Sequence, residues 1–359
     1  MSEKLIIKNF GPIKFVELDI RRFNVLIGDQ GTGKSTVAKI LIAIQNTVFR
    51  ELFDVSPNNL NRDTQLFFEY LKIAGIQNYY YRNTEISYTS LEYKFGLKKG
   101  EAIVERNFDL EKSLAYNFNY IPSERSLVIT VSDSLFALMQ TGTALPQLFL
   151  RFGDKFQKAR KDKQSFDYSN IIAVNYTHKE SGDFVTLPTG KEIPIHESSS
   201  GIQGAITMLT VFDFITKTEA VGNLLVIEEP ELNCFPETQN KIIKHFVENN
   251  TLQSGNKNNK YKNQILITTH SPYILTSLNN LIYANQVGRN HHEETNSIIE
   301  DIYWLNADDV SAYLMLKDGT CESIIDEEGL IKAEKIDEVS RRLNEEFDLL
   351  QNLELGINI

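Results

Sequence analysis

The stretch VLIGDQGTGKST, residues 25–36, decides the fold of this chain. It opens on three apolar residues that fit a buried β-strand, and a glycine-rich turn follows them directly. Gly28, Gly33, Lys34 and Ser35 stand at the spacing G-x-x-x-x-G-K-[ST], which is the complete pattern of a phosphate-binding loop. Apolar side chains then recur at helical spacing, so the stretch predicts a strand, a loop and a helix in succession.

The residue types in this loop suit a phosphate ligand. Glycine lets backbone N–H groups turn toward the β- and γ-phosphates, where a Cβ atom would obstruct the approach. Lys34 supplies a point cation, and the Ser35 hydroxyl is expected to bind Mg²⁺. The predicted phosphate-binding residues are Gly28, Asp29, Gln30, Gly31, Thr32, Gly33, Lys34, Ser35 and Thr36.

The composition indicates a soluble intracellular protein. The chain has 359 residues, of which 42% are hydrophobic and 24% charged, as in ordinary globular proteins. Its formal net charge of −11 argues against a surface that binds nucleic acid over its whole extent. A local basic run at residues 155–163 is a candidate for contact with nucleic acid. Two cysteines make no disulfide framework, and no signal peptide or membrane-spanning run is recognisable, so we expect a cytoplasmic protein without a membrane partner.

A second apolar run, LLVIEEPE at residues 224–231, ends in adjacent carboxylates. Glu228 and Glu229 would emerge at the end of a buried parallel strand, where carboxylates are costly unless they are functional or solvated. We expect Glu228 to order Mg²⁺ through water and Glu229 to polarise the water that attacks the phosphate. The alternative is an ordinary acidic turn in front of Pro230.

A third apolar run, ILITTHSP at residues 265–272, repeats the pattern. It delivers His270 to the carboxyl end of a buried strand, where the imidazole can hold a γ-phosphate or a water molecule in place. We therefore predict His270 as a γ-phosphate sensor, against the simpler interpretation of a structural histidine.

In their order along the chain these motifs resemble those of the ABC-type ATPases, in the branch that contains the SMC, RecF and overcoming-lysogenization-defect (OLD) ATPases. The segments that carry the resemblance are LIIKNFGPI (5–13), the phosphate loop (28–36), SSSGIQ (198–203), LLVIEEPEL (224–232) and ITTHSP (267–272). The resemblance implies an α/β P-loop NTPase of ABC-ATPase type, in which a mixed sheet core carries an antiparallel β lobe and a helical lobe. The segments EEPEL (228–232) and THSPYIL (269–275) match the OLD-like branch more closely than transporters, and the chain resembles stand-alone OLD-like ATPases that lack a toprim nuclease domain.

The resemblance also assigns ligands and further site residues. ATP and Mg²⁺ are the implied ligands, and Ser199, Ser200 and Gly201 would form the signature that caps the γ-phosphate bound to the other subunit. Without the resemblance, these serines are a plain N-cap cluster of the next helix. YIPSER, residues 120–125, lies where the family has its Q-loop glutamine, with Glu124 or Arg125 as the candidate γ-phosphate sensor.

The motifs divide the chain into a core and an extension. Residues 1–280 are expected to form the ATPase core, with lobes inserted at about 55–115 and 130–195. Residues 281–359 would complete the core and end in an amphipathic helix with apolar residues Ile336, Val339, Leu343, Phe347 and Leu350. Local patterns predict strands at 4–8, 14–20 and 23–27, antiparallel strands within 78–95, a hairpin around 188–190, and helices at 35–54, within 133–163, from 201 and near 237–249.

The resemblance implies a switch in which subunits of a homodimer, or of a higher homo-oligomer, close head to head around ATP and Mg²⁺. The output would pass to a separate effector protein, in prokaryotic anti-phage defence. The alternative is a RecF-like DNA-repair ATPase that contacts DNA through residues 150–163. A transporter ATPase is disfavoured by EEPEL at residues 228–232.

Overall fold

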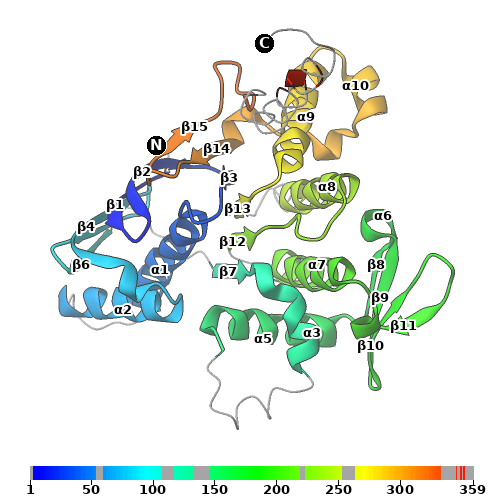
Figure 1. The fold of residues 1–359 in the computed structure, drawn as a ribbon, viewed down its shortest axis with the longest axis horizontal. Helices are drawn as coiled ribbons and strands as arrows, with labels where there is room; N and C mark the ends of the chain where they lie inside the picture. Colours follow the sequence, from blue (N-terminus) through cyan, green and yellow to red (C-terminus); the bar gives the residue numbers. More distant parts are fainter. Residues whose placement is uncertain are drawn as a thin grey trace.

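The computed structural model describes residues 3–53, 60–106, 117–132, 145–218, 223–252 and 263–332, together with Glu345, Asp348, Leu349 and Gln351. Three sheets and the helices between them make up these parts of the chain (Figure 1). The apolar residues of the predicted C-terminal amphipathic helix lie outside the described residues.

A six-stranded sheet in the order β15-β14-β3-β13-β12-β7 forms the centre of the molecule. Five of its strands are parallel, and β15 pairs antiparallel with β14 at one edge. The strands are β3 (Phe23–Gly28), β7 (Asn117–Ile121), β12 (Asn223–Glu228), β13 (Gln264–Thr269), β14 (Val310–Met315) and β15 (Cys321–Ser323). β12 and β13 are buried along their whole length, as expected for parallel strands covered on both faces.

Alternate side chains of the central strands enter two separate hydrophobic cores. Leu224 and Val226 join a cluster with α1 (Lys34–Phe53), whereas Leu225 and Ile227 join the cluster on the opposite face. That second face is covered by α7 (Ser200–Thr218), α8 (Pro236–Leu252) and α9 (Pro272–Gly288), and Figure 1 shows α1 on one side of the sheet and α7 and α8 on the other.

A five-stranded antiparallel sheet covers the far side of α1, in the order β2-β1-β4-β5-β6. Its strands are β1 (Glu3–Phe10), β2 (Ile13–Ile20), β4 (Tyr80–Thr89), β5 (Tyr93–Lys98) and β6 (Glu101–Arg106), with α2 (Leu60–Ile73) and the short turn η1 (Gln77–Tyr79) beside them. The strands predicted at 4–8, at 14–20 and within 78–95 are confirmed. They share one sheet although Ile20 and Tyr80 are 60 positions apart in the sequence.

The helical lobe follows β7 and carries a small sheet of its own. Its helices are η2 (Ser123–Ser126), α3 (Leu127–Ser132), α5 (Gln147–Asp162), α6 (Ser169–Ile172) and η3 (Ile195–Glu197). Its antiparallel strands are β8 (Ser165–Tyr168), β9 (Val174–Lys179), β10 (Gly182–Thr186) and β11 (Glu192–Pro194), in the order β11-β10-β9-β8. α5 confirms the second half of the helix predicted within 133–163, whereas residues 133–144 lie outside the described residues. The hairpin around Gly190 is also confirmed.

The segment after α9 returns to the central sheet. It contains α10 (His292–Ile298), η5 (Asp301–Tyr303) and η6 (Ala307–Asp309), and it leads into β14, which lies beside β3. Within the described residues, no helix is both long and apolar enough to cross a membrane. The α/β class predicted from the sequence is confirmed, with a mixed central sheet, an antiparallel β lobe and a helical lobe.

Candidate functional site

The carboxyl ends of three neighbouring parallel strands meet at one edge of the central sheet. The phosphate loop follows β3, Glu228 ends β12, and His270 comes directly after β13, which lies between the other two strands. Ligands of open α/β sheets bind outside this edge. The structure therefore brings together three segments that are far apart in the sequence.

Glycine is required in the phosphate loop for conformation and for space. Gly28, Gly31 and Gly33 have φ angles of +153°, +77° and +98°, in the region that side chains rarely adopt. A Cβ atom on Gly28 would lie 2.4 Å from the carbonyl oxygen of Met315 on β14. The loop therefore folds closely against the neighbouring strand while its far side stays open, because nothing lies within 4 Å of a Cβ built on Gly31.

The Lys34 side chain lies inside the loop. It is 6% exposed, and its ammonium donates hydrogen bonds to the carbonyl oxygens of Gly28 at 2.7 Å and Asp29 at 2.8 Å. Burial lowers the pKa of Lys34, and the nearby carboxylates of Glu229 and Asp29 oppose that shift. A desolvated cation held over a curved backbone is suited to a polyphosphate, which supplies several anionic acceptors at once.

The remaining loop residues divide into a structural and an exposed group. Thr32 is buried and donates from its hydroxyl to the Asp29 carbonyl at 2.8 Å, and Thr36 is buried in α1. Asp29, Gln30, Gly31 and Ser35 are exposed, so the Ser35 hydroxyl is accessible to a ligand. The Asp29 carboxylate pairs at 2.8 Å with Lys317, which lies just after β14, and Lys317 lowers the pKa of Asp29. The sequence contains no local signal for Lys317.

Glu228 lies at the buried end of β12 and has an unusual environment. It is 5% exposed, and its Oε1 atom is buried without a hydrogen-bond partner. The Glu228 carboxylate lies near the Tyr120 phenol. The pKa of Tyr120 is raised mainly by burial and, to a smaller extent, by the Glu228 carboxylate. A buried carboxylate oxygen without a donor is costly, and a cation at this position would satisfy it.

These residues fit a magnesium ion held by few protein atoms. Mg²⁺ commonly takes one or two protein oxygens and fills its octahedral shell with phosphate oxygens and water. Glu228 and the exposed Ser35 hydroxyl are such oxygens. In the described parts of the chain there is no group of three or more His, Cys, Asp or Glu side chains that would hold a metal without such additional ligands.

Glu229 differs from Glu228 in backbone conformation and in exposure. Its φ angle is +44°, in the left-handed region, and its N–H donates to the Thr268 carbonyl at 2.8 Å. The turn directs the Glu229 carboxylate to the adjacent strand end, where Oε1 lies 3.5 Å from Nε2 of His270. The Glu229 side chain is 31% exposed and that of His270 is 33% exposed, so both are open to a ligand and to water.

Glu231 joins the two turns that carry these groups. Its Oε1 atom accepts hydrogen bonds from the Thr269 hydroxyl at 2.6 Å and from the His270 N–H at 2.8 Å. The turn after β12 is thereby fastened to the turn after β13, and the backbone of His270 is fixed opposite Glu229.

Ser199, Ser200 and Gly201 stand at the amino end of α7. Both serines are exposed, and the Ser199 hydroxyl accepts a long hydrogen bond of 3.4 Å from the Ile202 N–H, which is the arrangement of a weak cap. A Cβ atom on Gly201 would lie 2.4 Å from the carbonyl oxygen of Asn233. In the described part of the chain, none of these three residues hydrogen bonds to the phosphate loop of the same subunit.

Comparison with protein families matches residues 1–135 and 130–275 to the family described as AAA ATPase domain. The chain belongs to this ATPase family. The ATPase activity expected from the motifs is thus confirmed at the level of the family. A search of curated proteins finds no match.

Solved structures similar to this ATPase include two kinds of protein. The SMC head domain from Thermotoga maritima has 12% sequence identity and a TM-score of 0.42, covering 90% of this chain and 98% of that one. The Smc head domain with an extended coiled coil, bound to the C-terminal domain of ScpA derived from Pyrococcus furiosus, has 11% identity and a TM-score of 0.43, covering 96% and 99%. The recombination mediator protein RecF-ATPrS of the RecFOR pathway has 10% identity and a TM-score of 0.44, covering 90% and 98%.

Arg125 of the ATPase does not have the surroundings expected of a γ-phosphate sensor. Its side chain is 1% exposed, and its guanidinium donates to backbone carbonyl groups of its own chain. Glu124, the other candidate, is exposed. The prediction of a phosphate contact for Arg125 is not supported, because the fork of the side chain is already occupied inside the core.

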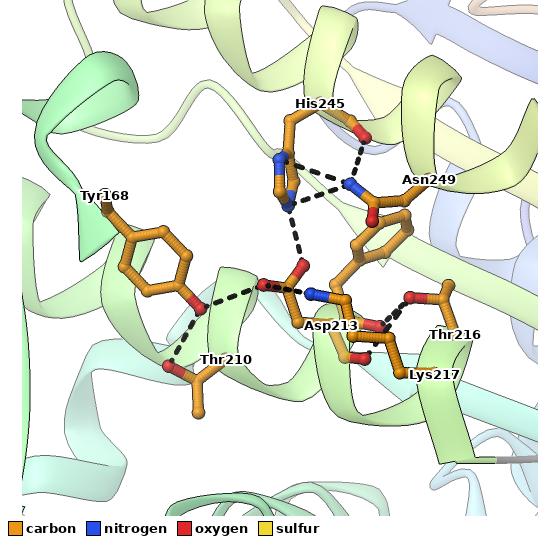
Figure 2. Close-up of polar contacts among 8 residues, drawn as sticks. Tyr168, Thr210, Asp213, Thr216, Lys217, His245 and Asn249 are labelled. Atoms are coloured by element: carbon orange, nitrogen blue, oxygen red, sulfur yellow. Dashed lines mark hydrogen bonds and ion pairs between the residues drawn. The ribbon is translucent and has the colours of Figure 1, made fainter. Parts of the chain in front are cut away.

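A buried polar network of the ATPase was missed by sequence reasoning. Asp213 of α7 is 7% exposed in its side chain and receives His245 Nε2 from α8 at 2.7 Å and the Tyr168 hydroxyl at 3.4 Å (Figure 2). Lys217 lies 3.4 Å from the same carboxylate, and Asn249 contacts the His245 ring. The only sequence signal was one acidic residue within the apolar run TVFDFI, and it named no partner.

The basic run 155–163 of the ATPase is partly paired within the chain. Lys158 pairs with Asp154 at 2.7 Å, and Arg160 pairs with Asp183 while its guanidinium also lies over the Phe156 ring. Lys163 lies over the Phe166 ring, 5.1 Å from its centroid. A part of the positive charge that suggested a nucleic-acid contact is therefore already paired within the helical lobe.

Proposed function

We propose that this ATPase binds ATP and Mg²⁺ at the carboxyl edge of β3, β12 and β13 and hydrolyses ATP there as a conformational switch. One observation carries the proposal, namely the convergence at this edge of the glycine loop around Lys34, the unpartnered buried oxygen of Glu228 and the Glu229–His270 pair. These are the parts that a phosphoryl-transfer site requires.

The residues of the chain divide the work between binding and proton transfer. The loop N–H groups and Lys34 hold the triphosphate, and Glu228 and Ser35 hold Mg²⁺, which when bound neutralises charge on the β- and γ-phosphate oxygens. Glu229 orients the attacking water and accepts its proton, because its carboxylate is open to solvent and fixed in direction. His270, at 3.5 Å from Glu229, holds the γ-phosphate or that water in place.

The site is completed, on this proposal, by a second copy of the chain. Ser199, Ser200 and Gly201 lie exposed at the amino end of a 19-residue helix, where N–H groups and the helix dipole favour an anion. In the described part of the chain these three residues make no hydrogen bond to the phosphate loop of the same subunit, and a site shared between two subunits requires them to be free of it. Closing of a head-to-head dimer on ATP, and its reopening after hydrolysis, would be the switch.

The output of the switch is proposed to act on a separate effector protein in the cytoplasm, in prokaryotic anti-phage defence. The second candidate is a RecF-like DNA-repair ATPase. Binding of a labelled duplex DNA, measured by anisotropy over a range of salt concentrations, decides between them. Saturable binding that weakens steeply with salt favours the repair ATPase, and its absence favours the effector.

The hydrolytic roles are tested by Glu229→Gln. This variant should retain ATP binding in calorimetry, whereas single-turnover hydrolysis should slow by roughly 10²–10⁴-fold, the usual contribution of a positioned base. Glu237→Gln, at an exposed acid of α8 that pairs with Lys241, is the matched control and should hydrolyse ATP normally. Hydrolysis by Glu229→Gln at the rate of the control would refute the proposed role.

A further inference from the structure

We infer that Arg125 is a positioning residue for Glu229 and that it fastens the backbone of this carboxylate to α7. This inference rests on the proposed role of Glu229 in hydrolysis. Among the described residues, Arg125 has the largest side chain that is fully buried, and it lies in the short turn η2 that follows β7. Burial lowers the pKa of Arg125, but a guanidinium remains protonated even so.

All the hydrogen-bond acceptors of Arg125 are backbone carbonyl oxygens. Nη1 donates to Glu228 at 2.7 Å and to Pro122 at 3.3 Å, Nη2 donates to Glu229 at 2.8 Å, and Nε donates to Gly204 at 3.2 Å. No carboxylate pairs with Arg125 in the described part of the chain. The planar guanidinium therefore fixes four backbone carbonyl groups at once. The single ammonium group of a lysine could not reach all four in this geometry.

Both peptide groups of Glu229 are fixed as a result. Its N–H is bonded to the Thr268 carbonyl on β13, and its carbonyl oxygen is bonded to Arg125. The left-handed backbone at Glu229, with φ at +44°, costs free energy and persists only where the surroundings determine it from both sides. The Leu232 N–H also donates to the Glu229 carbonyl, at 3.0 Å, so Arg125 is one of three contacts that fix these peptide groups and direct the carboxylate toward His270.

The Gly204 contact extends this clamp to α7. Gly204 lies in the first turns of that helix, one turn after Gly201 and Ser200, and η2 packs directly against α7. Displacement of the amino end of α7 by a γ-phosphate or by a second subunit would therefore move the guanidinium that holds the Glu228 and Glu229 carbonyls. Arg125 couples the exposed serines to the hydrolytic carboxylate.

Arg125→Lys tests the inference, with Arg21→Lys as a matched control. Arg21 also spans three carbonyls, donating from Nη1 to Ala307, Asp308 and Val310 at 3.2–3.3 Å, but it lies at the opposite end of β3 and β14. Arg125→Lys should bind ATP within about threefold of the unmodified protein and lose about 10²-fold in kcat, the scale of a misplaced catalytic group. Arg21→Lys should retain kcat. Equal kcat values for the two variants would overturn the inference.

A double variant separates positioning from general damage. If Arg125 acts through Glu229, adding Arg125→Lys to Glu229→Gln should lower single-turnover hydrolysis less than twofold further, because the effects of coupled residues do not add. Full additivity would overturn the inference and leave the role of Glu229 intact. Normal hydrolysis by Glu229→Gln alone would instead remove the proposed function on which the inference rests.

The unmodified protein supplies a test if Arg125→Lys does not fold. With ¹⁵N-labelled arginine, the Nε–H of Arg125 should give an NMR signal that exchanges slowly with solvent, because it is buried and bonded to Gly204. That signal should shift when ATP and Mg²⁺ are added to the Glu229→Gln protein. A signal that exchanges rapidly, or one that stays in place on saturation with ATP, would overturn the coupling.

Discussion

At the scale of single residues, the adjacent carboxylates of Glu228 and Glu229 differ in burial and in surroundings because the backbone changes conformation between them. Glu228 continues the strand and is buried, whereas the left-handed turn at Glu229 brings the next carboxylate out to His270. Burial leaves one oxygen of Glu228 without a donor, and exposure leaves Glu229 available to water. On the proposed function, the same residue type would hold a cation at position 228 and accept a proton at position 229.

Lys34→Ala should abolish tight ATP binding. The lysine supplies the only charged donor that the described loop residues place inside the loop, so its loss should weaken ATP affinity by about 10²-fold or more. Isothermal calorimetry measures this directly. Lys39→Ala, on the same helix, is the control and should bind as before. ATP affinity of Lys34→Ala within a few-fold of the control would contradict the assignment of the loop.

Glu228→Gln should change the magnesium dependence of turnover more than ATP binding. An amide cannot offer the second anionic oxygen, so the Mg²⁺ concentration at half-maximal turnover should rise by about 10–100-fold, as for groups that hold a metal through water. Turnover measured across a magnesium titration gives this number. An unchanged titration curve would show that the buried oxygen of Glu228 has no part in holding the metal.

At the scale of elements, the helices that flank the site are held to each other by buried polar groups. Burial acts to raise the pKa of Asp213, but the hydrogen bond and charge of His245, together with Lys217, outweigh it, so that the pKa is lowered. Asp213 on α7 and His245 on α8 thereby join the helix of the exposed serines to the helix that follows Glu231 (Figure 2).

Asp213→Asn should destabilise the protein in a manner that depends on pH. A lowered pKa contributes stability above the unfolded pKa of about 3.9, and this stability is lost as pH falls through the folded pKa. Urea unfolding should give the variant about 1–3 kcal/mol less stability near neutral pH, with a difference that narrows only below about pH 4. Asp154→Asn, at an exposed pair, should change little. A difference that is constant down to acid pH would contradict the ion-pair account.

Site residues that directly follow an apolar strand could be predicted from the sequence. Residues that act through contacts with distant parts of the chain could not. The phosphate loop, Glu228–Glu229 and His270 each follow an apolar strand directly, so strand ends and spacing were sufficient to locate them. Arg125 bonds a residue 104 positions away, and Lys317 reaches Asp29 from beyond β14. No periodicity or composition encodes such contacts, which is why the sequence left Arg125, with Glu124, as a candidate phosphate sensor and did not indicate its contacts with the backbone.

At the scale of the whole molecule, the proposed function has the exposed amino end of α7 connect the ATP site to a second subunit. Ser199 is open to solvent, Gly201 lies tightly against Asn233, and Gly204 leads through Arg125 to Glu229. A dimer that closes on ATP would use all of these contacts together. The switch proposed for this ATPase depends on that closure.

Sedimentation of the Glu229→Gln protein, with and without Ser199→Arg, tests the switch most directly. Glu229→Gln should dimerise when ATP and Mg²⁺ are added, since it binds ATP without hydrolysing it. Ser199→Arg in the same protein should leave ATP binding intact and block this dimerisation, because a bulky side chain stands where the γ-phosphate of the partner must approach. Analytical ultracentrifugation in which both proteins dimerise equally with ATP would contradict the shared site and leave the serines as a helix cap.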